Sequence, residues 1–445
     1  MSSAVEKLTS LAGAKDCYDI SHPELLPMQI EAADERLKSR GAIRLLAHRA
    51  ETAGIKTIRK AADLVPLLFA HTAYKSYPES WFTQGKWDRM GQWLDTVSSH
   101  RVRGIDNEGV EDVDGWIERL AAAGHFMSCS SGTTGKCSML TASMVDREVI
   151  RRYMTAAFEW ATKVPPRNEY RFVGAAPMVR NFRAIDAGDS VKDIYCDGVK
   201  HEYAGPPITV GQVSRMVAMR RDIANGTARP AEIAEFEATS KARQAAMEEA
   251  KATAVRLLIE YRGKKLMIGG MTGALFEVSE AVRAAGYGAK DFHPENIIQT
   301  AGGLKGAVVP PDYRERILET FNVSGPRVYQ FYSMQEVNTP FPPCSVGRYH
   351  IPPWVMLLLL DEGGDNLIEP TEGEIEGRAG FFDISLDGRW GGIISGDRVK
   401  VDYGQCACGH QGPTVNRDIV RYSDLPGGDK ISCAGTIDAY VRGAA

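Results

Sequence analysis

The chain has 445 residues, of which 44% are hydrophobic and 25% are charged, and its formal net charge at pH 7 is −4. These proportions are those of an ordinary globular protein, and the length allows one large domain or two to three smaller ones. The chain lacks the excess of basic residues that would indicate a nucleic-acid partner. The longest apolar run, Trp354 to Leu360, is too short to cross a bilayer. The first 16 residues lack an apolar signal core, so we expect a cytoplasmic protein with no membrane partner.

The first 125 residues are expected to form a mostly helical segment that packs on the rest of the protein. Apolar side chains recur at three- and four-residue spacing in 27–40, 41–53 and 57–71, which is the pattern of amphipathic helices. Three tryptophans follow between residues 81 and 97, and packing explains such spaced aromatic residues better than stacking on a cofactor.

Residues 126–420 are expected to form an α/β core with several sheets. Short apolar runs between turns that contain Gly or Pro predict strands at 170–176, 266–270, 296–302, 327–331 and 355–360. Between the first two runs lies a charged, alanine-rich stretch with an apolar stripe, which predicts a long helix over residues 231–261.

A glycine-hinged loop rich in hydroxyl groups runs from Ser130 to Lys136, with the sequence Ser-Ser-Gly-Thr-Thr-Gly-Lys. Its backbone N–H groups and hydroxyls are suited to a polyphosphate, and its glycines allow the backbone to approach the anion closely. The spacing does not fit the Walker A pattern. The simpler alternative is a polar turn of a kind that many proteins contain.

The loop resembles the Ser-Gly-Thr-Thr-Gly signature of the adenylate-forming superfamily, whose members join a carboxylate to AMP at the expense of ATP. Further segments resemble other parts of that superfamily in the same order along the chain: Gly302–Gly306, Tyr332–Glu336, Ser395–Asp397 and Arg421–Asp424. The closest resemblance is to the phenylacetate–CoA ligase-like branch. Within that branch, the segment Gly428–Thr436 is similar to short phenazine-antibiotic biosynthesis proteins.

The resemblance implies a role for each motif. Two glycine-rich loops and the segment after the second would supply the nucleotide-binding residues Ser130, Ser131, Gly132, Gly135, Gly302, Gly303, Leu304, Lys305, Tyr332 and Ser333. The departing phosphates would be held by Thr133, Thr134 and Lys136, and Glu336 would bind Mg²⁺. Asp397 would accept the ribose hydroxyls, and Arg421 would pair with phosphate or ribose. Taken singly, the last three residues could be ordinary turn or surface residues.

Three positions depart from the superfamily pattern. Cys137 stands where proline is usual, Ser138 where lysine or threonine is frequent, and Gln335 replaces the threonine or serine before the glutamate. The change at Gln335 affects the expected geometry at the α-phosphate, but the metal-binding carboxylate of Glu336 is retained.

The cysteines indicate a second site. Eight cysteines in a chain of this length do not make a disulfide scaffold, and clustered cysteines in a reducing compartment indicate metal binding or reactivity. Three thiolates and one imidazole suit a closed tetrahedral Zn²⁺ site, here from Cys344, His350, Cys406 and Cys408. His410 could compete as a ligand. In the alternative reading the four residues are unrelated and the cysteines are small buried hydrophobes.

We therefore expect the fold of the large N-terminal domain of an adenylate-forming enzyme, with residues 421–445 as a hinge and a truncated remnant of the small C-terminal domain. The expected function is ATP-dependent, Mg²⁺-dependent adenylation of an aromatic or other secondary-metabolite acid, with the acyl-AMP passed to a partner reductase, an amine or a carrier. Two alternatives remain: an acid–CoA ligase or amide synthetase with an altered C-terminus, and a non-catalytic nucleotide-binding subunit of a biosynthetic complex.

Overall fold

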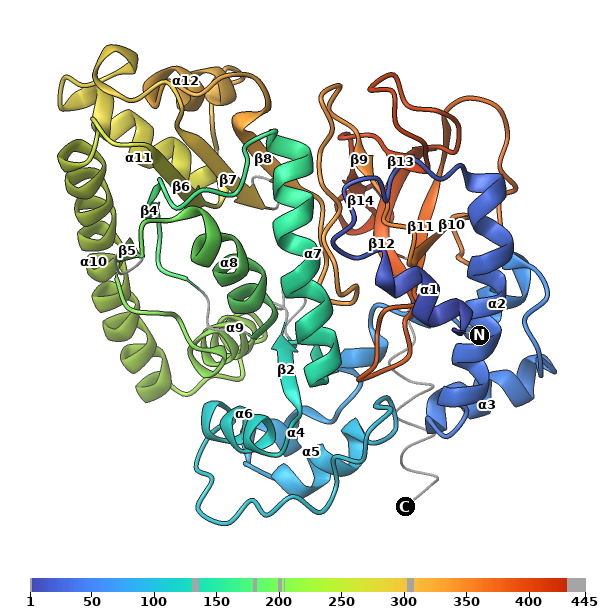
Figure 1. The fold of residues 1–445 in the computed structure, drawn as a ribbon. Coiled ribbons are helices and arrows are strands. Elements are labelled where there is room, and N and C mark those ends of the chain that lie inside the picture. Colours follow the sequence, from blue (N-terminus) through green and yellow to red (C-terminus); the bar gives the residue numbers. More distant parts are fainter. Residues whose placement is uncertain are drawn as a thin grey trace. The chain divides into compact units, whose positions relative to one another are not determined.

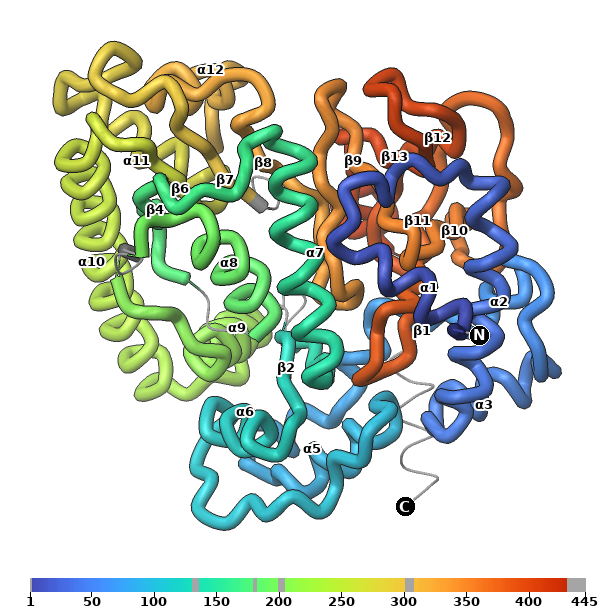
Figure 2. Tube along the Cα trace, viewed as in Figure 1, coloured from blue at the N-terminus to red at the C-terminus, as the bar shows by residue number. Residues whose placement is uncertain are grey.

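The structure is a computed structural model that describes residues 2–129, 136–178, 182–198, 202–203, 205–301 and 308–429 (Figures 1 and 2). The chain forms two compact units. Unit 1 comprises Met1–Ser131, Lys136–Tyr153 and Met334–Ala445, and unit 2 comprises Gly132–Gly135 and Met154–Ser333. The mixed α/β fold with several sheets is confirmed, whereas the division at residues 125 and 420 stays a prediction.

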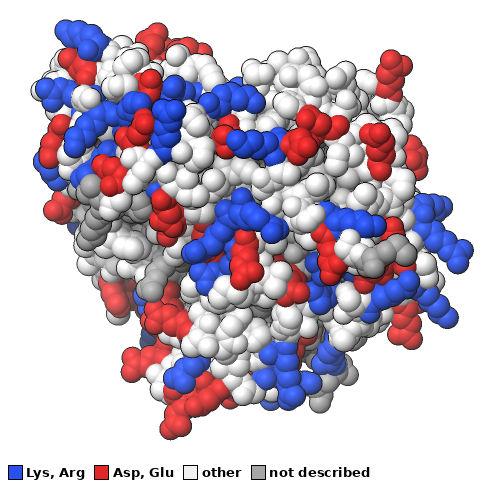
Figure 3. All heavy atoms as spheres, viewed as in Figure 1, with Lys and Arg blue, Asp and Glu red and all other residues white. Residues whose placement is uncertain are grey.

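Two features of the molecule bear on membranes and on charged partners: the apolarity of its helices and the distribution of its surface charge. Among the helices that the structure describes, none combines the length and the apolarity that crossing a bilayer requires. Acidic and basic side chains are interspersed over the face shown in Figure 3, so that face carries no broad field of one sign.

Within the described residues 2–129, the N-terminal part of unit 1 contains six α-helices. It contains α1 (Ala4–Ser10), α2 (His22–Arg40), α3 (Arg44–Ala53), α4 (Glu79–Thr83), α5 (Trp87–Leu94) and α6 (Val113–Ala122). The tryptophans pack as expected: Trp87 stacks on Trp116 at a centroid distance of 5.3 Å, and Trp93 meets the ring of Tyr77 edge-on at 5.0 Å.

The predicted helix at residues 57–71 is wrong. Residues Ala61–Leu67 form a 3₁₀-helix that contains Pro66, and Phe69–Ala70 form strand β1. Proline supplies no N–H for an α-helical hydrogen bond. In addition, β1 pairs in parallel with β12 at Ile393 and Ile394, so sheet pairing overrides the helical spacing of the apolar residues.

Unit 1 is built on a seven-stranded sheet. Its main path is β10 (Val355–Leu360), β11 (Ile375–Asp383), β12 (Gly392–Asp402), β13 (Thr414–Val415) and β9 (Tyr349–His350), and β1 and β14 (Val420–Arg421) also pair with β12. All six residues of β10 are buried, as its apolar run predicted. A separate antiparallel pair, β2 (Phe126–Cys129) and β3 (Met139–Ala142), flanks the glycine-rich loop in sequence, and α7 (Met144–Thr162) follows it and continues into unit 2.

Unit 2 contains a parallel sheet in the order β5 (Glu202–Tyr203), β4 (Arg171–Gly174), β6 (Leu266–Gly270), β7 (Ile297–Ala301) and β8 (Val328–Phe331). Four of these strands lie where the apolar runs predicted them. The connecting helices are α8 (Phe182–Tyr195), α9 (Val210–Ala224), α10 (Pro230–Glu260), α11 (Thr272–Ala284) and α12 (Tyr313–Thr320). The predicted long helix corresponds to α10.

The helices of unit 2 cover both faces of the sheet. One face buries Val173, Ile268 and Ile298 in a core cluster to which α10, α11 and α12 contribute. On the other face, Phe158 of α7 packs edge-on against Tyr195 of α8 and Tyr329 of β8. The chain leaves β4 toward β5 and returns on the other side of β4 to form β6. The carboxyl ends of β4 and β6 are therefore a topological switch point, where sheets of this kind bind ligands.

Gly269, near the carboxyl end of β6, is packed too tightly for a side chain. A Cβ atom at this position would lie 2.8 Å from Cε2 of Phe172, and changing Gly269→Ala should lower the free energy of unfolding by about 1–3 kcal/mol, because the ring has to move. Urea denaturation followed by circular dichroism measures the effect. The matched control is Gly263→Ala in the same unit, where nothing lies within 4 Å of the added methyl group. Equal stability of the two variants would contradict the prediction.

Candidate functional site

Asp397 and Arg421, both singled out from the sequence, lie together on the sheet of unit 1. Asp397 is on β12 and Arg421 is on β14, and the antiparallel register places the two residues directly opposite each other. The guanidinium Nε of Arg421 is 3.8 Å from Oδ1 of Asp397. The backbone N–H of Asp397 donates to the Ser395 hydroxyl at 3.0 Å, within the part of β12 where the pairing with β11 shifts register.

Glu336 lies in a loop of unit 1 whose backbone is held by a buried arginine. Arg389 donates to the carbonyl oxygens of Gln335 at 3.1 Å and Glu336 at 3.0 Å. Its other terminal nitrogen donates to the carbonyl of Thr141 on β3 at 2.7 Å. Arg389 is 2% exposed, so these bonds form in a low-dielectric interior, where they are strong and costly to break. The carboxylate of Glu336 thus projects from a fixed backbone.

Two buried carboxylates complete this arrangement. Asp146, at the start of α7, accepts hydrogen bonds from the backbone N–H groups of Ser143, Asp387 and Gly388. Asp383, at the end of β11, accepts a hydrogen bond at 2.7 Å from the N–H of Asn338, two residues after Glu336. Burial raises the pKa of both carboxyl groups, and the charge of Arg389 acts in the opposite direction. We call Asp146, Asp383 and Arg389 the buried charge cluster.

Most of the predicted phosphate and adenine contacts cannot be placed. Ser130, Ser131, Gly132, Thr133, Thr134, Gly135, Gly302, Gly303, Leu304 and Lys305 lie outside the described residues. Lys136 is described, and its ammonium donates to the carbonyl of Tyr77 at 2.8 Å. The Tyr77 hydroxyl in turn donates to the carbonyl of Cys137 at 2.8 Å. This exchange ties the end of the glycine-rich loop to the helical part of unit 1.

The remaining predicted nucleotide residues follow β8. Tyr332 is buried in unit 2, and Ser333 is the last residue of that unit. Gln335, which departs from the superfamily pattern, has a buried side-chain oxygen without a hydrogen-bond partner among the residues that the structure describes.

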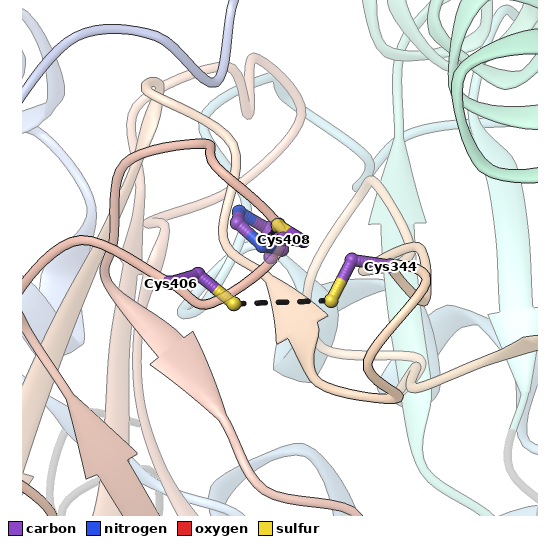
Figure 4. A group of neighbouring side chains, drawn as sticks. Cys344, Cys406 and Cys408 are labelled. Atoms are coloured by element: carbon purple, nitrogen blue, oxygen red, sulfur yellow. Dashed lines mark hydrogen bonds between the residues drawn. The ribbon is translucent and has the colours of Figure 1, made fainter.

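The fold brings together the four predicted metal ligands of unit 1, and Figure 4 labels the three cysteines among them. The ligand atoms of Cys344, His350, Cys406 and Cys408 all lie within 4.8 Å of one another. The two sulfur atoms of Cys344 and Cys406 are 3.9 Å apart, and Sγ of Cys408 is 3.4 Å from Nε2 of His350. The pairing of β9 with β13, which sets His350 opposite Thr414, joins the two chain segments that carry these ligands.

Two similar turns present the cysteines. In one, the N–H of Gly347 donates to the carbonyl of Cys344, and in the other the N–H of Gly409 donates to the carbonyl of Cys406. Both glycines have positive φ, +83° and +97°, a conformation that other residues rarely adopt. Backbone N–H groups of Cys408 and His410 also donate to the cysteine sulfurs of the second turn. Such bonds orient ligand atoms and stabilise thiolates.

The structure distinguishes between the two histidines considered as ligands. Burial, assisted by the neighbouring His410, lowers the pKa of His350 to about 3, so its imidazole is neutral, which is the form that binds metals. His410 instead has its Nδ1 2.6 Å from Oδ1 of Asp19 and is not one of the four clustered residues. Burial raises the pKa of Cys408 to about 12, so this thiol would need a cation nearby to ionise at neutral pH.

Several residues that shape the site were missed by the sequence analysis: Asp146, Asp383, Arg389, Arg378 and Asp429. Asp429 lies in the Gly428–Thr436 segment, where it was given no role, and the other four are single ionisable residues outside any motif. In a sequence such residues cannot be told from the charged residues of an ordinary surface. Only their burial shows that they are structural.

Comparison with known proteins adds little. No protein-family model and no curated protein matches the chain. A solved structure described as McyG A-PCP complexed with phenylalanyl-adenylate is similar over 66% of this chain and 41% of that chain, with 13% identity and a TM-score of 0.34. The chain thus spans less than half the length of that protein, and at this TM-score the likeness supports no conclusion about function.

Replacing Arg389 tests the buried charge cluster. We expect Arg389→Met to destabilise unit 1 by about 3–5 kcal/mol, because three carbonyl groups lose their donor and two buried carboxylates lose the nearby cation. The control, Arg398→Met on β12, removes a half-exposed ion pair with Glu376 and should cost about 0–1 kcal/mol. Urea denaturation of both variants gives the comparison.

The same variant has an expected pH dependence. Groups whose pKa is raised in the folded state bind more protons there than in the unfolded state, so their contribution to stability falls as the pH rises. Loss of Arg389 should raise the pKa of Asp146 and Asp383 further, so the deficit of Arg389→Met should shrink as the pH falls below neutral. A deficit that stays constant or grows over this range would contradict the role given to the cluster.

Proposed function

We propose that this protein activates a carboxylic acid by ATP-dependent adenylation and belongs with the phenylacetate–CoA ligase-like branch of the adenylate-forming enzymes. The observation that carries the proposal is the pairing of Asp397 with Arg421 across β12 and β14. These residues come from two separate motifs of the ordered set, and a carboxylate beside a guanidinium offers acceptors for ribose hydroxyls and donors for phosphate.

In the proposed reaction the carboxylate of the acid attacks the α-phosphate of ATP, an acyl–phosphate bond forms, and pyrophosphate leaves. Negative charge on the phosphate oxygens must be stabilised throughout, so positioning and electrostatics dominate catalysis. Thr133, Thr134 and Lys136 would hold the departing phosphates. Lys136 would then exchange its bond to the Tyr77 carbonyl for one to phosphate. Tyr332 and the 302–305 loop would contact the adenine, with Ser333 nearby.

Glu336 fits a role as a magnesium ligand. Mg²⁺ prefers oxygen ligands, usually keeps several waters, and is bound by one or two carboxylates together with substrate phosphates. When bound, the ion would neutralise charge on the phosphates. The contribution of the protein is a carboxylate whose backbone is fixed by Arg389, so that it keeps its position as the substrates enter and leave.

We place the acid in unit 2, at the carboxyl ends of β4, β6 and β7. This is the switch point of a doubly wound parallel sheet. The family resemblance favours an aromatic or other secondary-metabolite acid. The acyl-AMP would pass to a partner reductase, a carrier or an amine. An acid–CoA ligase or amide synthetase would differ only in this second step, and product analysis with CoA or an amine present distinguishes them.

We further propose that Cys344, His350, Cys406 and Cys408 hold a structural Zn²⁺. A tetrahedral site with Zn–S bonds of about 2.3 Å and Zn–N bonds of about 2.0–2.1 Å requires S···S distances of about 3.8 Å and S···N distances of about 3.6 Å. The S···S distance of 3.9 Å and the S···N distance of 3.4 Å are close to these values. Four protein ligands leave no open position, so the ion would brace the β9 and β13 segments without entering the reaction.

The adenylation proposal is tested with Asp397→Asn. This isosteric change removes the charge that would accept two ribose hydroxyls, and we expect the Kd for MgATP to rise at least tenfold, since a hydrogen bond to a charged group contributes about 1.5–3 kcal/mol. Isothermal titration calorimetry measures the change. The control Glu376→Gln removes a half-exposed carboxylate of β11 and should leave the Kd within twofold.

The catalytic part needs a turnover assay. ATP–pyrophosphate exchange with a panel of aromatic and aliphatic acids should show acid-dependent exchange for the wild type and its loss in Asp397→Asn. Binding of MgATP without exchange for any acid would favour the non-catalytic nucleotide-binding subunit, the alternative that the unusual residues Cys137 and Gln335 suggest.

The zinc proposal predicts that the two histidines differ. His350→Ala should lose the metal and have a lower melting temperature, because metal binding is coupled to folding. His410→Ala, which loses the contact with Asp19 and the ring contact with His350 but no metal ligand, should retain close to one equivalent of zinc. Inductively coupled plasma mass spectrometry of untagged protein gives the metal content. Equal zinc content in the two variants, or none in the wild type, would refute the ligand set.

A further inference from the structure

The Ser395–Asp397 segment lies inside β12, where the register of the pairing with β11 shifts. It is in contact with a second set of charged residues in unit 1. Arg378, on β11, is 0% exposed. Its guanidinium donates to the carbonyl of Ser395 at 2.9 Å and to Oδ1 of Asp429 at 3.0 Å, and lies 3.8 Å from the ring centroid of Tyr422. The buried guanidinium of Arg378 therefore joins Ser395 of β12 to Asp429, the last described residue of the chain.

His71 completes this set. It directly follows β1, and its backbone N–H continues the pairing with β12 by donating to the carbonyl of Ile394 at 3.0 Å. Its Nε2 lies 3.8 Å from Oδ2 of Asp429. Burial lowers the pKa of His71, so the ring is neutral and the guanidinium of Arg378 is the main counter-charge for Asp429. We call Arg378, Asp429 and His71 the Arg378 clamp.

Gly396 allows the Arg378 clamp to lie directly against residues 395–397 of β12. A Cβ atom at this position would lie 3.3 Å from Oδ2 of Asp429 and 3.7 Å from Cε1 of His71. Any side chain here would crowd the carboxylate and the imidazole. The lack of a side chain at Gly396 thus allows the carboxylate of Asp429 to lie close to the backbone of β12.

Strand pairing and side-chain packing bring the segment from Val420 to Asp429 to residues 395–397 of β12. It pairs with β12 through β14, buries Tyr422 against Arg378, and turns back through Gly427 and Gly428, which have positive φ. Its two ends contact adjacent residues of β12: Arg421 contacts Asp397, and Asp429 lies against Gly396.

From this geometry we propose that Asp429 is a positioning residue for nucleotide binding, which acts through Arg378 and Gly396 to hold Asp397 in the orientation that accepts ribose. This inference rests on the proposed function. Without the carboxylate, Arg378 would lose its ion pair with Asp429, and removing one partner of a buried pair is strongly unfavourable. The guanidinium would then move toward water or another acceptor and release the Ser395 carbonyl. Asp397, two residues further along β12, would lose its fixed position.

The test is the variant Asp429→Asn, measured by calorimetric titration with MgATP. We expect the Kd to rise at least tenfold, while circular dichroism and zinc content stay as in the wild type. The control is Asp424→Asn in the same segment, an exposed residue whose carboxylate accepts a hydrogen bond from the neighbouring Ser423 hydroxyl. This control should leave the Kd within twofold.

A double-mutant cycle separates positioning from a general structural role. If Asp429 acts through Asp397, then Asp429→Asn should have little further effect on the Kd in a protein that already carries Asp397→Asn. Additive effects would overturn the proposal, as would an unchanged Kd in Asp429→Asn. If the wild type itself fails to bind MgATP, the proposed function fails and the role of the clamp fails with it. Binding by the wild type that is unchanged in Asp429→Asn overturns the clamp alone.

Discussion

The arrangement of unit 1 depends on burying Arg389 near two carboxylates. Asp146 and Asp383 are each 1% exposed and Arg389 is 2% exposed, so each charge would be very costly if it stood alone. Their hydrogen bonds reach three separate parts of the chain: the start of α7, the 335–338 loop and the loop between β11 and β12. Since none of these loops can move without leaving a buried charge or carbonyl group unpaired, the cluster sets the backbone from which Glu336 projects.

Strand β12 performs a comparable task through its backbone. It pairs with β1 from the first part of the chain and with β11, β13 and β14 from its last part. Three of these pairings each bring one functional group: His71 after β1, Arg378 on β11 and Arg421 on β14. The metal-ligand group lies further along the same sheet, where β13 pairs with β9. One strand thus connects the proposed ribose carboxylate to the proposed zinc site.

The clamp and the metal group stabilise their surroundings by different means. The four metal ligands are soft donors that favour zinc and would hold their loops by coordination. The clamp is an ion pair around a buried guanidinium, which is weak evidence for stability but strong evidence for a specific arrangement, because removing one partner is far more costly than never having had the pair. We therefore expect loss of the metal to affect folding and loss of Asp429 to affect the orientation of Asp397.

The sequence by itself determined the elements whose burial is uniform or whose chemistry is concentrated. The parallel strands of unit 2 read as continuous apolar runs because both of their faces are covered, and α10 showed its apolar stripe. The cysteine spacing indicated the metal group because thiols and imidazole have few other reasons to cluster. The tertiary structure alone decided that 57–71 is not an α-helix, that His350 and not His410 joins the cysteines, that Arg378 and Arg389 are interior residues, and that Asp429 pairs with Arg378. The physical reason is that a strand pairing or a buried ion pair joins residues that are hundreds of positions apart, and local spacing carries no signal of such a partner.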